Sequence, residues 1–188
     1  MRRRALIAGL VSAGMLSAAS RALATLADQF NSQFYTIVSA AAANNIADVR
    51  VFITRGTNAD TVDSHGRTAL SFAAQLGNAE MAQLLIGARA SPDLRDNMGG
   101  TALHWAAENG RLEVTRVLLA AHATVDLANR QGITPLMLAV SHGALPVVTA
   151  LLAAGADPRK SDFTGRDAFG YAAGKPAVLQ ALQTAAKP

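Results

Sequence analysis

Apolar residues along the chain gather in pairs of short clusters, and polar stretches that contain glycine separate one pair from the next. In the clearest pair, residues 102–107 (ALHWAA) are followed, beyond a glycine, by residues 112–119 (LEVTRVLL). The second cluster carries its apolar residues at helical spacing, which gives a helix one apolar stripe. The pattern therefore predicts two short helices joined by a turn.

The residues that flank the clusters predict where these helices begin and end. A threonine stands before the first cluster of three units, at Thr68, Thr101 and Thr134. Each threonine is followed by Ala or Pro and then an apolar run, so each can cap its helix. A glycine follows each first cluster, at Gly77, Gly110 and Gly143. Glycine adopts a positive φ without strain, which suits the end of a helix.

The pattern returns every 33 residues. The start of a unit reads DSHGRTAL from Asp63, DNMGGTAL from Asp96, NRQGITPL from Asn129 and DFTGRDAF from Asp162. The glycines of these motifs, the helix-ending glycines and a series of leucines (Leu85, Leu118, Leu151) all keep the same step. Three independent series in phase indicate a repeat protein, in which each unit stacks on its neighbours.

This sequence resembles the ankyrin repeat family over roughly residues 30 to 188. The matched residues in one unit are Asp96, Gly99, Thr101 to His104, Ala106, Ala107, Gly110, Leu112 to Val114, Leu118 and Leu119. The resemblance implies an all-α ankyrin-repeat solenoid of about five helix-turn-helix units with short β-hairpin-like loops. It also implies that His104 is structural and hydrogen-bonds the neighbouring loops.

The expected domain runs over residues 34–188. It divides into a degenerate N-terminal cap repeat (34–62), three full repeats (63–95, 96–128 and 129–161) and a C-terminal cap repeat (162–188). The last repeat is shortened after Ala173 and ends in a helix expected from about Pro176 to Ala186. Arg89 and His122 replace a glycine that Gly155 supplies elsewhere, and Asp167 replaces the capping threonine, which is a mild change because aspartate also caps helices.

Composition and charge place limits on function. Apolar residues make up 51% of the chain but aromatic residues only 5%, so alanine must allow close helix packing. Of the 17 basic residues, four precede Thr25, and those after it balance the 13 acidic residues. A neutral body removes the electrostatic argument for nucleic-acid binding. The absence of cysteine excludes disulfides and a lipidated cysteine anchor.

Residues 1–24 have the pattern of an export signal, with Arg2 to Arg4, an apolar run from Ala5 to Ala19 and the cleavage motif Ala22-Leu23-Ala24. Either the Sec or the twin-arginine route fits. An alternative is an uncleaved anchor within residues 5–27, and only then would the protein touch a membrane. Residues 25–33 are expected to be a short linker or the start of a helix. We expect the protein in the periplasm of a bacterium.

The pair His104 and Glu108 is four residues apart and could share a helix face. With His142 on the next repeat, they could form a metal-dependent or hydrolytic site, which is the alternative function. A zinc site normally needs three protein ligands, and no catalytic motif, cofactor motif or metal-ligand spacing supports this alternative. Trp105 falls in register with Phe72, Leu138 and Tyr171, which predicts core packing.

The resemblance to ankyrin repeats implies a partner that is another protein, bound by the loop tips and the exposed side of the first helices. Carried over to this chain, the expected tip positions are Ser64, His65, Arg67, Asn97, Met98, Gly100, Arg130, Gln131, Ile133, Phe163, Thr164 and Arg166. The expected helix positions are Gln75, Leu76, Glu108, Asn109, Ser141 and His142. Methionine, aromatic and arginine side chains are enriched at protein interfaces. The expected function is therefore a non-catalytic interaction module, an accessory or scaffold subunit of an enzyme or membrane complex.

Overall fold

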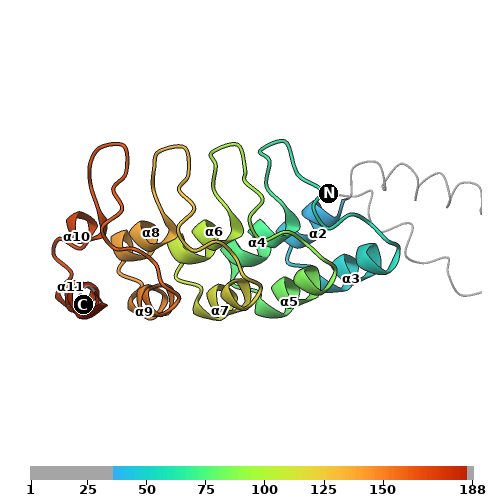
Figure 1. The fold of residues 1–188 in the computed structure, drawn as a ribbon. Coiled ribbons are helices and arrows are strands. Elements are labelled where there is room, and N and C mark those ends of the chain that lie inside the picture. The colour runs from blue at the N-terminus through green and yellow to red at the C-terminus, as the bar shows by residue number, and fades with distance from the viewer. Residues whose placement is uncertain (1–35, 186–188) are drawn as a thin grey trace, which may run out of the picture. The chain divides into compact units, whose positions relative to one another are not determined.

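The structure is a computed structural model that describes residues 36–185, and Figure 1 shows its helices. The signal peptide and linker expected in residues 1–33 lie outside the described residues. The helices of the described part are α2 (Ile37–Ala42), α3 (Ile46–Thr54), α4 (Ala69–Leu76), α5 (Ala79–Gly87), α6 (Ala102–Glu108), α7 (Leu112–Ala120), α8 (Pro135–Ser141), α9 (Leu145–Ala153), α10 (Ala168–Tyr171) and α11 (Pro176–Ala185). None of these helices is long and apolar enough to cross a membrane.

The helices from Ile37 onward stack as five pairs. An inner row contains α2, α4, α6, α8 and α10, and an outer row contains α3, α5, α7, α9 and α11 (Figure 1). Extended loops project from the inner row and return the chain to the next pair. This arrangement confirms the predicted all-α solenoid of about five helix pairs.

The core consists of the same positions repeated from pair to pair. Among them, Leu70, Leu103 and Leu136 of the inner row and Leu85, Leu118 and Leu151 of the outer row are all completely buried. Alanines at the inner-row contacts, such as Ala73 and Ala106, are also completely buried and let neighbouring helices approach closely. Shortening a buried leucine to alanine typically costs 2–5 kcal/mol, so these few positions carry much of the stability.

The helix ends follow the predicted signals. Thr68 has an extended backbone, and its hydroxyl accepts a hydrogen bond from the backbone N–H of Ser71 at 3.1 Å. Gly77 follows α4 with a φ of 82°. Arg89 and His122, which replace glycine after the outer helices, adopt φ values of 64° and 59°. They therefore take the left-handed conformation that Gly155 adopts at a φ of 89°, at a steric cost that glycine does not have.

His104 joins two repeats: one ring nitrogen bonds its own repeat and the other bonds the next. Its Nδ1 accepts a hydrogen bond from the backbone N–H of Thr101 at 3.1 Å, and its Nε2 lies 3.1 Å from the carbonyl oxygen of Ile133. Because Nδ1 accepts, the proton of the neutral ring must be on Nε2, which donates to Ile133. The side chain is 3% exposed, and burial lowers its pKa to about 4.

We predict that acid destabilises the protein through His104. Above pH 6.5 the ring is neutral in both the folded and the unfolded chain. Between pH 6.5 and 4 the unfolded chain binds a proton at this ring and the folded chain does not. The free energy of unfolding therefore decreases as the pH is lowered, by about 3 kcal/mol at most. Urea unfolding at several pH values checks this for the wild type and for His104→Gln, which should be less stable at neutral pH. Equal pH dependence in the two proteins would contradict the assignment.

Candidate binding surface

Four hairpins form the projecting edge of the solenoid, and each is organised by the side chain at its first position. These tip hairpins are residues 63–67, 96–100, 129–133 and 162–166. Oδ1 of Asp96 accepts hydrogen bonds from the backbone N–H groups of Met98 and Gly100, both at 2.8 Å. Asp63, Asn129 and Asp162 accept from the N–H groups at the same two positions of their hairpins, at 2.8 to 3.0 Å. Each tip thus has a fixed backbone.

The second atom of each of these side chains finds a partner of its own. Oδ2 of Asp96 accepts from the indole N–H of Trp105 at 3.1 Å, and Oδ2 of Asp162 accepts from the hydroxyl of Tyr171 at 2.6 Å. The corresponding atom of Asp63 instead accepts from the guanidinium of Arg67. In the third hairpin, the side-chain amide of Asn129 donates to Gln131, so no carboxylate is left to satisfy.

These contacts also set the ionisation of the hairpin side chains. The hydrogen bond from the Thr164 hydroxyl, followed by that from Tyr171, holds the pKa of Asp162 well below its usual range. The same contact with Asp162 raises the pKa of the Tyr171 phenol. For Asp63, partial burial opposes the shift, but hydrogen bonds from Arg67 and His65 lower its pKa overall. The hairpin carboxylates Asp63 and Asp162 are therefore held in their charged form.

Neighbouring hairpins are joined by their backbones. The N–H groups of Asn97, Arg130 and Phe163 donate to the carbonyl oxygens of His65, Met98 and Gln131 in the preceding hairpin, at 2.9, 3.0 and 3.1 Å. The donating residue also lies across the glycine of that hairpin. A Cβ added to Gly132, for example, would come within 2.8 Å of the Phe163 ring. The glycines at these tips are thus required by close approach as well as by their positive φ.

Most of the expected tip residues are exposed, and the others are half-buried or buried. Ser64, His65, Asn97, Met98, Arg130, Gln131, Phe163, Thr164 and Arg166 are exposed. Met98 is 58% exposed and Phe163 is 80% exposed, although both are large and apolar. Gly100 was expected at the surface but is buried, because its N–H turns inward to Asp96. Arg67 and Ile133 are half-buried.

The expected helix positions are less open than the tips. Leu76, Asn109 and His142 are exposed, whereas Gln75, Glu108 and Ser141 are half-buried. Several of these side chains bind their own helix: Ser141 donates to the Leu138 carbonyl, and Asn109 donates to the Trp105 carbonyl. No such bond holds the side chains of Gln75, Leu76 and Glu108 to their own helices.

The prediction of core packing for Trp105 and its equivalents was only partly correct. Phe72, Trp105, Leu138 and Tyr171 are all half-buried, so they form a stripe along the inner helices that solvent reaches. The guanidinium of Arg67 lies over the Phe72 ring at 4.3 Å, and that of Arg166 lies over the Tyr171 ring at 5.1 Å. The 33-residue spacing found this stripe but could not show which side of the helix faces out.

The structure does not assemble the alternative site of His104, Glu108 and His142. Both nitrogens of His104 are occupied by Thr101 and Ile133, so the ring has no free atom for a metal. Within residues 36–185, no group of three or more His, Cys, Asp or Glu side chains is placed to hold a metal ion. The spacing of these residues was therefore misleading, because the histidine is used for packing two repeats together.

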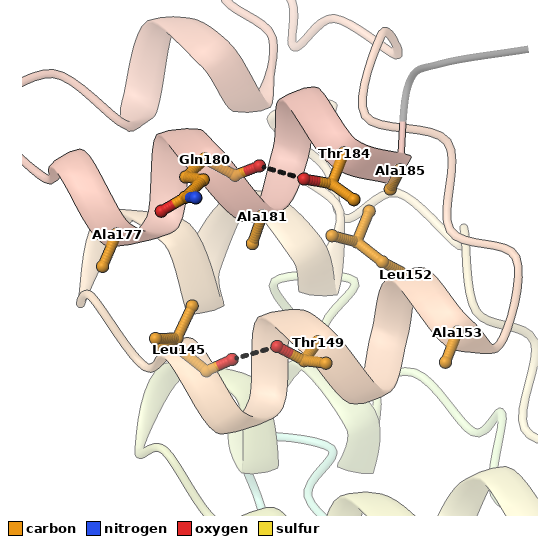
Figure 2. Close-up of a pocket in the computed structure, with 9 residues that line it drawn as sticks. All are labelled: Leu145, Thr149, Leu152, Ala153, Ala177, Gln180, Ala181, Thr184 and Ala185. Carbon is orange, nitrogen blue, oxygen red and sulfur yellow. Dashed lines mark hydrogen bonds between the residues drawn. The ribbon is translucent and has the colours of Figure 1, made fainter.

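The outer helices also present an apolar hollow. It lies between α9 and α11, measures about 540 Å³ and is lined only by uncharged residues (Figure 2). The hydroxyl groups of Thr149 and Thr184 donate to carbonyl groups of their own helices, at 3.0 and 2.9 Å. With its hydroxyl groups satisfied in this way, the hollow offers a partner apolar contact and few hydrogen bonds.

We predict that Asp96 and Trp105 stabilise the second hairpin as a coupled pair. Asp96→Ala leaves three N–H donors without their acceptor and should lower the free energy of unfolding by about 2–4 kcal/mol. Asp96→Asn should cost less, because Asn129 holds the same two backbone donors in the third hairpin. Urea unfolding of Asp96→Asn, Trp105→Phe and the double variant should give a coupling energy of about 1 kcal/mol. Strictly additive effects would show that the indole bond contributes nothing.

Comparison with known proteins identifies the architecture. A family model described as ankyrin repeats (3 copies) matches residues 11–96, 37–129 and 88–162, which together cover most of the chain. A search of curated proteins gave no match. The family match agrees with the stacked helix pairs, the hairpins and the 33-residue step found in the structure. The chain belongs to the ankyrin repeat family.

Proposed function

We propose that this protein is a non-catalytic protein-binding module that uses its tip hairpins and the exposed side of its inner helices. Ankyrin repeats are in general protein-binding modules, which supports a protein as the partner. The family is usually non-catalytic, which supports a binding role over an enzymatic one. The solenoid provides the extended surface that repeat proteins use for binding.

One observation carries this proposal: exposed, varied side chains stand on a fixed hairpin backbone. Met98, Arg130 and Phe163 project from hairpins whose N–H groups bind Asp96, Asn129 and Asp162 and also the neighbouring hairpin. Binding to such a surface loses little conformational entropy, because the backbone is already ordered. Aromatic residues, methionine and arginine are enriched at protein interfaces, and arginine is among the residues that most often dominate the binding energy.

The proposal includes a location. The basic start, the apolar run and the Ala22-Leu23-Ala24 motif of residues 1–24 support export to the periplasm of a bacterium. There the module would serve as an accessory or scaffold subunit of an enzyme or a membrane-bound complex. Retention of residues 5–27 as an anchor would place it beside such a complex.

We predict that affinity capture from native cells depends on the tips. The bait is the full chain, and the tip variant carries Met98→Ser, Arg130→Ser and Phe163→Ser. Loss of these side chains should reduce recovery of the specific partner by at least about tenfold, because hot-spot truncations cost 2 kcal/mol or more. Quantitative mass spectrometry of the captured proteins provides the measurement.

A matched variant on the outer helices serves as control. It carries Val51→Ser on α3 and Arg116→Ser on α7, two exposed positions on the opposite row of helices. The control should capture the same partner as the wild type. If the wild type and the tip variant capture the same proteins in equal amounts, the tips are not the binding surface.

We predict that the native protein is found in the periplasmic fraction and begins at Thr25. Cleavage after Ala24 removes the basic start and the apolar run together. Cell fractionation followed by N-terminal sequencing checks both points. A protein that begins at Met1 and stays in the membrane fraction would support the anchor instead, and a cytoplasmic protein would contradict export altogether.

A further inference from the structure

The last repeat exposes a surface that every full repeat before it buries. We call this surface the C-terminal face and define it by the hollow that Phe169, Ala172, Ala173, Gly174, Lys175, Pro176 and Leu179 line, together with the tip hairpin 162–166. The hollow measures about 290 Å³ and lies between α10 and α11. In Figure 1, α10 and α11 form one end of the rows of helices.

Comparison with equivalent positions shows what is unusual about the C-terminal face. Phe169 is half-buried, whereas Leu70, Leu103 and Leu136, which precede it by steps of 33 residues, are completely buried. Ala173 is exposed, whereas Ala74, Ala107 and Val140 are completely buried. At each inner repeat these positions lie on a helix that packs against the following inner helix. The C-terminal face is therefore a copy of the repeat interface without its second half.

The fourth hairpin is open in the same way. Gly66, Gly99 and Gly132 are each covered by a residue of the following hairpin, within 2.8 to 2.9 Å of an added Cβ. Gly165 has nothing within 4 Å of that position. Gly165 and Arg166 are exposed, whereas the corresponding two residues of each earlier hairpin are buried or half-buried.

The first inner helix described is more buried than the last: in α2, Ile37, Val38, Ala40 and Ala41 are all buried. In α10, Ala168 is the one buried residue. A terminal repeat normally needs a polar outer face for solubility, and here Phe163, Phe169 and Leu179 break that rule.

The charges of the last repeat favour an acidic partner. Within residues 162–185, the basic residues are Arg166 and Lys175, and the acidic residues are Asp162 and Asp167. Both carboxylates accept backbone N–H groups of their own repeat, and Asp162 is only 7% exposed. Arg166 is exposed, with its guanidinium over the Tyr171 ring, and half-buried Lys175 lines the hollow and donates to the carbonyl oxygen of Tyr171 at 3.2 Å. Neither contact is with a carboxylate, so both cations can still face the acidic groups of a partner.

We propose that the C-terminal face docks an amphipathic helix of another protein, with apolar side chains on one side and carboxylates beside them. A helix is the occupant because an inner helix covers the equivalent surface of each earlier repeat. The apolar side chains pack on Phe169 and Leu179, and the carboxylates face Arg166 and Lys175. This proposal rests on the proposed function and extends its binding surface from the tips to one end of the solenoid.

The test uses the full chain and a defined probe. The probe is a synthetic helical peptide with leucines at helical spacing flanked by glutamates, and its twin has lysines in place of the glutamates. Titration into ¹⁵N-labelled protein, followed by NMR, should shift the amide signals of residues 162–179 in a saturable way. The acidic peptide should bind about fivefold more tightly than the basic one at low salt, because two exposed charge pairs are gained.

Two substitutions and a control locate the binding. Leu179→Gln should weaken the acidic peptide severalfold, and Arg166→Gln should reduce its preference over the basic twin. The control Leu152→Gln changes the uncharged hollow between α9 and α11 and should leave binding unchanged.

Shifts that do not saturate, equal binding of the two peptides, or shifts centred on α9 and α11 would overturn the proposal. Signals of residues 162–179 that change with protein concentration alone would indicate a second copy as occupant and would also overturn it. The two proposals can fail separately, because Met98 and Arg130 lie outside the C-terminal face. A tip variant that carries only Met98→Ser and Arg130→Ser tests the tips without changing that face.

Discussion

The structure depends on one constraint: a single helix pair cannot bury its own apolar side chains. Each inner helix must be covered by the next, and the completely buried leucines and alanines record that contact from repeat to repeat. The 33-residue step follows directly, because every unit has to offer the same surface to the following unit. The hairpins follow as well, since their backbones meet at the spacing that the helices impose.

The shape of each hairpin is fixed by the hydrogen bonds of its first side chain. Each Asp or Asn at the first position satisfies two inward N–H groups, and its remaining atom requires a third partner. In the first hairpin that partner is Arg67, at the fifth position. In the second and fourth hairpins it is Trp105 and Tyr171, which lie on the inner helix. In the third hairpin the fifth position is Ile133 and the helix position is Leu138, and neither side chain can donate a hydrogen bond. The first residue there is Asn129, whose side-chain amide donates to Gln131. The residues at the first and fifth hairpin positions and at the inner-helix position therefore depend on one another.

The sequence predicted the frame more completely than the surface, for a physical reason. Periodicity shows which residues are equivalent, and the threonines and glycines act locally, so helix ends and repeat order could be predicted from them. Exposure depends on neighbours that periodicity does not describe. Trp105 was expected in the core because the equivalent residues of the other repeats are apolar or aromatic. Its indole N–H instead donates to the Asp96 carboxylate, and the side chain is half-buried. Gly100 was expected at the surface, yet its N–H turns inward.

The hydrogen bonds between hairpins have a consequence for how the protein can change over time. At Asn97, Arg130 and Phe163 the contact with the preceding hairpin is made by the backbone N–H, which every residue except proline possesses. The side chains at these positions are an amide, a guanidinium and an aromatic ring in three successive repeats, yet the backbone contact is the same. Substitution of Arg130 or Phe163 can therefore alter recognition while the backbone contact stays, whereas the side-chain amide of Asn97 also donates to the carbonyl oxygen of Ser64 at 3.1 Å. Natural selection can change the partner of such a protein one tip at a time, and the scaffold accepts each intermediate.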